Sequence, residues 1–476
     1  MRALVWFRSD LRVADNTALH EACRAADRGV VAVFVVTPRQ WREHDWGPPK
    51  VDFVLRCLSA LSEELEERRI PLLIRETPRF SGVPKLLTGL AREHECDALC
   101  FNEEYEVNEA GRDRKVRVAF EERDLQVRAF HDQTVLPPDL VRTGSGDFYR
   151  VFTPFKRAWI GEVLQRGIPE PRRRPRRLAT PVTSLDEVPR SLPGFEPPSG
   201  LADLWPAGER AAQKRLDRFI RRGIGDYKKD RDFPGIEGTS RISPYLAAGA
   251  ISPRQCLAAG AAANMGELDS GERGPVTWIS ELVWREFYRH ILVGYPRVCR
   301  NRAFKPETER IVWDDDDARF RAWAEGRTGV PIVDAAMRQL AETGWMHNRL
   351  RMIAAMYLTK DLFLDWRRGE AWFMRHLVDG DFASNNGGWQ WSASTGCDAA
   401  PYFRIFNPVR QSERWDPDGE FIRSHVPELA GLEAPGIHDP SALPPLERAG
   451  LDYPEPLVDH RDAVARAVEE FRRLKD

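Results

Sequence analysis

The run Val30-Val-Ala-Val-Phe-Val-Val36 is continuously apolar and rich in β-branched side chains. Such a run is typical of a strand that is buried on both faces, as in a parallel sheet covered by helices. It is followed by an amphipathic helical pattern over residues 51–69. Similar short apolar runs occupy residues 3–7, 71–74, 98–101 and 126–130. The alternation of strand and helix predicts an α/β domain with a Rossmann-like parallel sheet over residues 1–132.

The turn after the first predicted strand lacks the glycines of a dinucleotide-binding fingerprint. Its sequence is Arg8-Ser-Asp-Leu-Arg12. Parallel sheets bind ligands beside the carboxyl ends of their strands, and a G-x-G-x-x-G turn is the usual cradle for a dinucleotide there. The sequence therefore disfavours a standard dinucleotide site in this domain.

The bulk composition excludes several classes of protein. A chain of 476 residues is too long for one hydrophobic core, so more than one domain is predicted. The net charge of −2 excludes a globally basic nucleic-acid-binding protein and leaves only a local patch for such a role. The chain has no long apolar stretch typical of a membrane span. Its seven cysteines include no C-x-x-C pair, which indicates reduced thiols and therefore a cytoplasmic protein. The same absence predicts that the chain has no metal site.

Residues 133–205 are predicted to form a connector, because they show little periodicity. They contain Pro137-Pro138, a proline-rich segment over residues 189–198, and the basic run Pro171-Arg-Arg-Arg-Pro-Arg-Arg177. The basic run is open to two interpretations, a phosphate contact or a solvated linker, and the linker is favoured. From about residue 206 strand patterns cease, and helical periodicity predicts an all-helical domain over residues 206–476.

A short loop near the start of the helical region has the composition of a phosphate cradle. Gly238-Thr-Ser-Arg241 supplies hydroxyl groups, backbone amides and one guanidinium group. Ser243-Pro244 then predicts a helix start, with Ser243 as the N-cap and the proline in the first turn. Such a helix start suits an anion, although N-caps of this kind are also common without any ligand.

Residues 278–288 are predicted to form a helix with an unusual face. Trp278, Glu281 and Trp284 lie on one side of it at three-residue spacings. A carboxylate between two tryptophans is poor core composition, because burying it unpaired is costly. One interpretation is a surface ion pair between Glu281 and Arg285. The other is a slot in which a tryptophan stacks on a base and the carboxyl group hydrogen-bonds the base edge.

The stretch Asp379-Gly-Asp-Phe-Ala-Ser-Asn-Asn-Gly-Gly-Trp-Gln-Trp391 combines carboxylates, amides, paired glycines and two tryptophans. Asn385-Asn-Gly-Gly388 is predicted to interrupt helical structure, because glycine loses backbone entropy and asparagine competes for backbone hydrogen bonds. A bend at this point would let the main chain approach a flat ligand closely. The alternative is a buried turn with two packing tryptophans, Trp389 and Trp391.

Together these segments resemble the photolyase/cryptochrome family, and within it the class I cyclobutane pyrimidine dimer (CPD) DNA photolyases. The resemblance runs from Trp6-Phe-Arg-Ser-Asp-Leu-Arg12 to Pro427-Glu-Leu429. Its most specific parts are Trp284-Arg-Glu-Phe-Tyr288, Gly344-Trp-Met-His-Asn-Arg349 and the stretch over residues 379–391. It implies an α/β antenna domain and an all-α FAD-binding domain joined by a long connector. It also implies light-dependent splitting of pyrimidine dimers by an electron from photoexcited reduced FAD.

The resemblance further implies the residues of the site. Those similar to the FAD diphosphate and ribityl cradle are Tyr227, Thr239, Ser240, Arg241, Ile242 and Ser243. Those similar to the groups beside the isoalloxazine and ribose are Asp379 with its ion-pair partner Arg351, Gly380, Asp381, and Asn385, whose amide faces flavin N5. Trp389, Trp366 and Trp313 match a chain that carries an electron from the surface to the flavin. Glu281, Trp284, Asn348, Met352 and Trp391 match the pocket for the flipped dimer, and Arg231, Arg349 and Arg404 match phosphate contacts.

The antenna residues also follow from the resemblance. His44, Glu109 and Cys299 are similar to residues of the folate-binding members, which implies 5,10-methenyltetrahydrofolate as antenna. An 8-hydroxy-5-deazaflavin antenna, or no antenna, is the alternative. From its position alone, a glutamate after a strand is more often a helix N-terminal charge than a ligand.

Two other activities occur on the same scaffold. A (6-4) photolyase usually has histidines in this part of the pocket, so Asn348 and Met352 favour the cyclobutane substrate. A cryptochrome-type blue-light photoreceptor often carries a long C-terminal tail, whereas this sequence ends in a short charged helix predicted over residues 461–475. The expected partner is UV-damaged DNA, with no membrane partner. The chain is expected to be a monomer in the cytoplasm and to be nucleoid-associated when bound to DNA.

Overall fold

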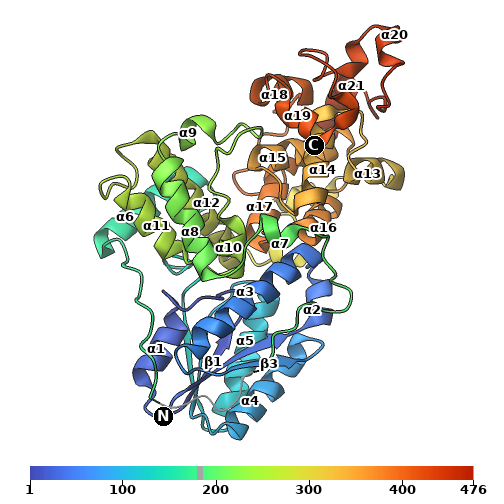
Figure 1. Cartoon of the computed structure of the whole chain (residues 1–476). Coiled ribbons are helices and arrows are strands. Elements are labelled where there is room, and N and C mark those ends of the chain that lie inside the picture. Colours follow the sequence, from blue (N-terminus) through green and yellow to red (C-terminus); the bar gives the residue numbers. More distant parts are fainter. Residues whose placement is uncertain (180–185, 475–476) are drawn as a thin grey trace. The chain divides into compact units, whose positions relative to one another are not determined.

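The computed structural model describes residues 1–179 and 186–474 and divides the chain into two compact units (Figure 1). The first unit comprises residues 1–225, 240–299 and 378–380, and the second comprises residues 226–239, 300–377 and 381–476. Within the described ranges, no helix is long and apolar enough to cross a membrane.

The first unit contains the predicted parallel sheet, which confirms the α/β prediction. Its strands are β1 (Ala3–Phe7), β2 (Val30–Val36), β3 (Leu72–Glu76), β4 (Ala98–Asn102) and β5 (Gln126–Phe130). Their order in the sheet is β3-β2-β1-β4-β5, and all neighbouring pairs are parallel. Every residue of β1, β2 and β4 is buried, as their continuous apolar sequences require.

Helices cover both faces of this sheet (Figure 1). The chain moves outward from β1 to β3 and then crosses back to β4 and β5, and right-handed crossovers place the helices of the two directions on opposite faces. Trp6 and Phe101 point into the core formed with α4 and α5, where their rings meet edge to face at 5.6 Å. The helices of this region are α1 (Thr17–Ala25), α2 (Pro38–Glu43), α3 (Pro48–Glu66), α4 (Val83–Glu93) and α5 (Val107–Glu121).

The carboxyl ends of β1 and β4 are closed by the protein's own polar side chains. Asn102 Nδ2 donates to Asp10 Oδ2 at 2.6 Å, and Asp132 pairs with both Arg12 and Arg254. Burial opposes ionisation of Asp132, but the two guanidinium groups outweigh it and hold the pKa of Asp132 below its usual range. The crevice that binds ligands in many parallel sheets is therefore filled here.

The remaining helices of the first unit include one that the sequence analysis missed. Helix α6 (Phe152–Arg166) lies inside the predicted connector and packs against α12. Phe152 stacks on Trp284 with ring centroids 3.6 Å apart, so this helix is stabilised by tertiary packing. In the basic run, Arg174 pairs with Glu64 and Glu209 at 3.0 and 2.7 Å, which differs from a wholly solvated linker. The other helices are α7 (Leu201–Leu204), α8 (Glu209–Arg222), α10 (Ser243–Ala248), α11 (Pro253–Ala262) and α12 (Arg273–Gly294).

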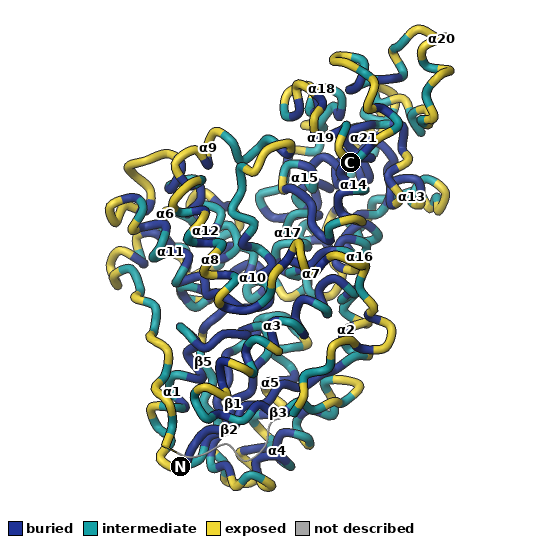
Figure 2. Tube along the Cα trace, in the orientation of Figure 1, coloured by how far each residue is buried: buried dark blue, intermediate teal, exposed yellow. Residues whose placement is uncertain are grey.

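The second unit is all-helical, as predicted, and its core lies in α14 to α17 and α19 (Figure 2). Its helices are α9 (Tyr227–Asp230), α13 (Asp317–Ala324), α14 (Pro331–Thr343), α15 (Asn348–Met356), α16 (Trp366–His376), α17 (Phe382–Ala393), α18 (Pro408–Trp415), α19 (Glu420–His425), α20 (Pro445–Arg448) and α21 (His460–Arg472). A π-helical turn, η4 (Tyr357–Asp361), follows α15. Short 3₁₀ turns are η1 (Phe80–Gly82), η2 (Val298–Arg300), η3 (Pro306–Arg310), η5 (Pro427–Leu429) and η6 (Pro440–Ala442).

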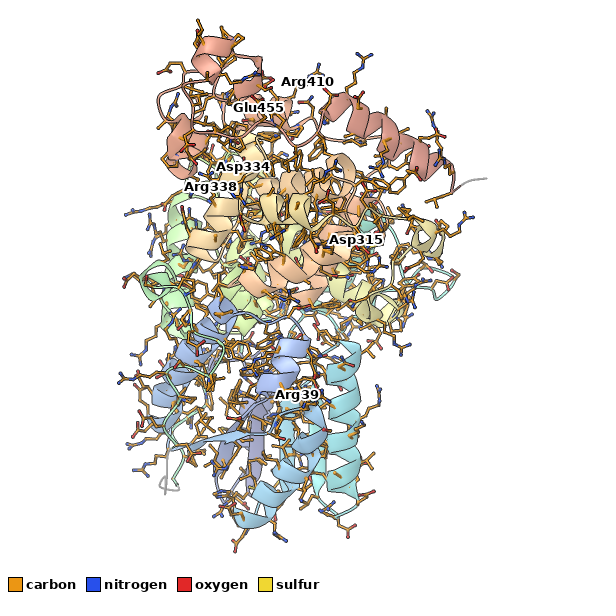
Figure 3. All side chains as sticks on the ribbon, turned by 90° about the vertical axis from the view of Figure 1, so that its right-hand side faces the viewer. Arg39, Asp315, Asp334, Arg338, Arg410 and Glu455 are labelled. Carbon is orange, nitrogen blue, oxygen red and sulfur yellow. The ribbon has the colours of Figure 1, made fainter. Side chains whose placement is uncertain are left out.

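A buried carboxylate on α14 fixes the C-terminal segment to this core. Asp334, which is labelled in Figure 3, is fully buried. It accepts hydrogen bonds from Thr328 N and Oγ1, both at 2.7 Å, and from the Tyr453 hydroxyl. One turn further along α14, Arg338 pairs with Glu428 at 2.8 Å. These contacts connect segments far apart in the sequence through one helix.

The prediction of a bend at residues 385–388 is wrong, because α17 runs without interruption through them. Asp381 caps the helix by accepting from Ser384 N at 3.0 Å. Inside the core, Asn386 Nδ2 donates to Glu370 Oε1 at 2.8 Å, and Gln390 Nε2 donates to Asn386 Oδ1 at 2.9 Å. This amide network and the packing of α17 on α16 override the low helix propensity of the paired glycines.

Gly369 on α16 is required by the close approach of Trp389. A Cβ at position 369 would lie 2.1 Å from the Trp389 ring, whereas a Cβ at Gly388 would meet no described atom within 4 Å. We expect Gly369→Ala to lower the free energy of unfolding by about 1–3 kcal/mol through overpacking. Gly388→Ala is the matched control and should be neutral or stabilising by up to about 1 kcal/mol. Urea unfolding of both variants measures this difference. Equal changes in the free energy of unfolding would contradict the close packing of Trp389 on Gly369.

Candidate functional site

The predicted cofactor-binding residues are distributed over both units. In the first unit, Ser240 to Ser243 precede and begin α10, and Arg241 adopts a left-handed backbone with φ of 47°. The prediction that Ser243 caps this helix is wrong: Ile242 is the N-cap, Ser243 is the first helical residue, and no side chain caps the helix. Asp379 and Gly380, also in the first unit, are both buried. The second unit holds Tyr227, Thr239, Arg351, Asp381 and Asn385.

Asn385 has a fixed amide orientation. Its Nδ2 donates to the backbone oxygen of Glu370 at 3.0 Å, and no described residue donates to its Oδ1. Three residues along α17, the glycine at 388 leaves the backbone without a covering side chain. An acceptor oxygen near bare backbone suits a flat ring that carries an N–H donor. The hydroxyl and guanidinium groups of Thr239, Ser240, Arg241 and Ser243 suit a diphosphate. A flavin dinucleotide requires both kinds of group, one to contact its ring and one to contact its diphosphate.

Two of the second-unit cofactor residues also have structural contacts that the sequence did not predict. Asp381 is the N-cap of α17, and its carboxylate accepts from both N and Oγ of Ser384. Arg351 Nε donates to the backbone oxygen of Met346 at 2.9 Å. Hydrogen bonds within the protein therefore orient both side chains independently of any ligand.

The three predicted electron-chain tryptophans lie in the second unit and differ in burial. Trp389 and Trp366 are 2% and 1% exposed, and Trp313 is half-buried against Phe363, with ring centroids 5.0 Å apart. The indole Nε1 of Trp389 is buried and has no partner among the described residues. A fourth tryptophan, Trp323, lies 6.0 Å from Trp389 in an edge-to-face contact. No sequence pattern distinguishes Trp323, because this residue has the pattern of an ordinary apolar residue of α13.

Two of the predicted pocket residues, Glu281 and Trp284, lie on α12 in the first unit, and both are half-buried. Phe152 covers one face of Trp284. The third residue of the predicted face, Trp278, is 2% exposed and packs on Phe219, so it belongs to the core. Arg285 Nη1 donates to the Gln133 carbonyl at 2.6 Å, a contact that the surface-pair interpretation did not include.

The other three pocket residues lie on α15 and α17, which pack together in the second unit. Asn348 is exposed, and Met352 is half-buried one turn further along α15. Trp391 is half-buried near the end of α17. His347, the residue before Asn348, caps α15 by accepting a hydrogen bond from Arg349 N at 3.2 Å.

Burial lowers the pKa of His347 to about 4. The folded protein therefore binds fewer protons than the unfolded chain below pH 6.5, and the free energy of unfolding should fall as the pH drops from 6.5 towards 4. This histidine contributes roughly 3 kcal/mol at most over that window. His347→Asn keeps an N-cap acceptor and removes the titration, so unfolding midpoints measured across this pH range should change less steeply. His131→Asn, at a more exposed histidine, is the control, and an unchanged slope in His347→Asn would contradict this assignment.

The predicted phosphate-binding arginines of the second unit share one carboxylate. Arg349 Nη2 pairs with Asp232 Oδ1 at 2.9 Å, and Arg231 Nε lies 3.9 Å from the same oxygen. The Arg349 guanidinium group also lies over the ring of Trp415, 4.8 Å from its centroid. Arg404 is exposed. Sequence reasoning missed the roles of Asp232 and Trp415, since both contact Arg349, which is more than sixty residues away in the chain.

The predicted antenna residues His44 and Glu109 are in contact in the first unit, with Nδ1 and Oε1 3.1 Å apart. Asn108 and Gln40 both approach His44 Nε2 at 3.0 Å. Burial alone would lower the pKa of His44, but the hydrogen bond and charge of Glu109 raise it above its ordinary value. Glu109 also lies in the first turn of α5, and Cys299 is half-buried. Among the described residues, no group of three or more His, Cys, Asp or Glu side chains is arranged to hold a metal ion.

Comparison with known proteins assigns the chain to a family. Residues 3–175 match the family model described as DNA photolyase, and residues 278–473 match the FAD binding domain of DNA photolyase. The chain is 46% identical to the deoxyribodipyrimidine photo-lyase of Escherichia coli over 472 residues, which cover 99% of this chain and 98% of that protein. The chain belongs to the DNA photolyase family.

Solved structures of photolyases and cryptochromes have the same fold. A class III photolyase from Agrobacterium tumefaciens is 36% identical, with a TM-score of 0.90 over 100% of this chain and 98% of that one. A cryptochrome from Synechocystis is 29% identical, with a TM-score of 0.88 over 98% of each chain. The photolyase fold predicted from the sequence is thereby confirmed, and the second unit contains most of the FAD-binding domain.

Proposed function

We propose that this photolyase is a deoxyribodipyrimidine photo-lyase that uses light to split cyclobutane pyrimidine dimers in DNA. The observation that carries the proposal is the 46% identity, over nearly the whole length of both chains, to the Escherichia coli protein of that name. The cryptochrome is also similar over almost its whole length, but at the lower identity of 29%. Asn348 and Met352 further favour a cyclobutane dimer over a (6-4) lesion.

The dimer is bound by side chains of α12, α15 and α17 in this proposal. Trp284 and Trp391 offer aromatic faces for stacking on a flipped dinucleotide, and flipping costs less at a lesion that already stacks and pairs poorly. Glu281 hydrogen-bonds the dimer through its carboxyl group and stabilises the negative charge that develops there. Asn348 and Met352 complete the contacts with one polar and one polarizable side chain. Arg231, Arg349 and Arg404 bind the flanking phosphates.

FAD is proposed to be bound by the cradle of Tyr227, Thr239, Ser240, Arg241, Ile242 and Ser243, and by Arg351, Asp379, Gly380, Asp381 and Asn385. When bound in its reduced form, FAD supplies the light-excited electron donor that opens the cyclobutane ring. Asn385 presents Oδ1 as an acceptor, since Glu370 holds its Nδ2. Trp313, Trp366 and Trp389 conduct electrons inward from an external reductant, and their burial, from half-buried to fully buried, supports that direction.

The antenna is proposed to be 5,10-methenyltetrahydrofolate, with His44, Glu109 and Cys299 as its binding residues. The contact between His44 and Glu109 supports this choice. The filled crevice at the ends of β1 and β4 argues against a ligand deep in the sheet. Residues 1–132 would then form the antenna domain, residues 133–205 the connector and residues 206–476 the FAD-binding catalytic domain. The protein is proposed to be a monomer that acts on chromosomal DNA in the cytoplasm.

Absorption spectroscopy and a repair assay test the proposal. The purified protein should show flavin bands, and a separate near-UV band if the folate is present. After chemical reduction, it should restore thymine absorbance in dimer-containing DNA under blue light but not in the dark. Intact binding of the dimer without light-dependent recovery would contradict the proposed enzyme.

A further inference from the structure

Asp232 lies between two arginines that are proposed to bind DNA phosphates. Its Oδ1 is 2.9 Å from Arg349 Nη2 and 3.9 Å from Arg231 Nε. The three side chains are only 15–20% exposed, so solvent screens their interaction less than it would screen a surface pair. A single carboxylate therefore neutralises part of the positive charge of both arginines.

This arrangement has a direct consequence for binding to undamaged DNA. Attraction between arginines and phosphates supplies nearly all of the affinity for undamaged DNA, whereas contacts with the lesion supply the preference for a dimer. A carboxylate beside the arginines repels each approaching phosphate and competes with it for the guanidinium hydrogen bonds. This cost falls equally on damaged and undamaged DNA. The damaged duplex is still held by its lesion contacts, whereas the undamaged duplex, which is held by phosphate contacts alone, is released sooner.

We propose that Asp232 lowers the affinity of the enzyme for the DNA backbone and so shortens its residence on undamaged DNA. This inference rests on the proposed function, because the lesion contacts are those of the proposed dimer-binding residues. Asp232 weakens the phosphate contacts of Arg231 and Arg349, so that recognition of the dimer governs the residence of the enzyme on DNA.

The opposite role for Asp232 makes a different prediction. If the carboxylate mainly holds Arg349 in a phosphate-binding orientation, removing its charge would release the arginine and weaken binding to every DNA. The ring contact of Arg349 with Trp415 remains in either case and keeps the guanidinium group near its present place. We therefore expect the charge effect of Asp232 to dominate.

The test measures DNA binding by the FAD-containing protein in the dark. Wild type and Asp232→Asn are titrated with a duplex that contains one cyclobutane dimer and with the same duplex undamaged. The variant should bind both duplexes several-fold more tightly at low salt, with the ratio of the two affinities unchanged, and should dissociate more slowly from the undamaged duplex. If one more phosphate is neutralised, the advantage of the variant should shrink about threefold between 50 and 200 mM salt.

Asp230→Asn is the matched control, since Asp230 lies two residues away and its nearest cation is Lys229 at 4.0 Å. Equal gains in both variants would reduce the effect to general charge and overturn the proposal. Weaker binding of Asp232→Asn to both duplexes, or no change, would also overturn it. The proposed function fails separately, if wild type itself does not prefer the duplex with the dimer. Flavin content and thermal unfolding of each variant establish that it is folded.

Discussion

Trp313→Phe should slow light-driven reduction of the bound flavin by about tenfold or more, which corresponds to at least about 1.4 kcal/mol in the barrier. Phenylalanine keeps an aromatic ring in contact with Phe363 but is far harder to oxidise than indole. Because Trp313 is half-buried whereas Trp366 and Trp389 are buried, it is the member of the chain best placed to exchange electrons with a reductant in solution. The measurement is the rate of flavin bleaching under blue light with an external thiol.

The same variant should repair normally after chemical reduction, since the electron chain is then bypassed. Trp372→Phe is the matched control. Trp372 is also partly buried against the core of the second unit, but it stacks on His376 and is not one of the three proposed electron-transfer tryptophans. Loss of repair in pre-reduced Trp313→Phe would indicate a structural defect. Equal loss of photoreduction in Trp372→Phe would remove the assignment of Trp313 as the terminal donor.

Glu281→Ala should lower the yield of dimer splitting, with losses on the order of 100-fold if its hydrogen bond acts as other preorganised catalytic donors do. The carboxyl group is half-buried on α12, where a hydrogen bond to developing charge is stronger than in bulk water. Repair per absorbed photon is measured with pre-reduced protein and saturating dimer DNA, so that binding is not limiting.

A control on the same helix separates chemistry from binding. Trp284→Ala should instead weaken affinity for the dimer by roughly 1–3 kcal/mol through lost stacking. It should leave the splitting yield of the bound dimer less affected than Glu281→Ala does. If Glu281→Ala changed only the affinity, the carboxyl group would be a binding group without a part in splitting.

The sheet was predicted well because the residues of each strand are enough to identify it. The continuous apolar residues of β2 and β4 are explained by burial on both faces, and no distant partner has to be known. His44 and Glu109 were each predicted as antenna residues only through the resemblance, and their contact was not predicted, since His44 follows α2 and Glu109 lies in α5. Their contact at 3.1 Å depends on how α2 and α5 meet, which no local pattern contains.

Three of the features that were predicted wrongly or missed have a common physical cause, which is tertiary packing. Residues 385–388 have poor helix propensity, yet α17 is helical because Asn386 finds a buried carboxylate on α16. Helix α6 was missed because it is stabilised by Phe152 stacking on Trp284, more than a hundred residues away. Asp232 was missed for the same reason, since its partner Arg349 is distant in the chain. Each of these features requires a partner that the local sequence does not reveal.

A comparison of two DNA lesions under light tests most directly whether this protein splits cyclobutane pyrimidine dimers. Pre-reduced protein is mixed with oligonucleotides that contain either one cyclobutane thymine dimer or one (6-4) product, and each is kept in the dark or under blue light. Our account predicts recovery of thymine from the cyclobutane dimer in the light alone, and none from the (6-4) product. Recovery from the (6-4) product, or no recovery from a bound cyclobutane dimer in the light, would contradict it.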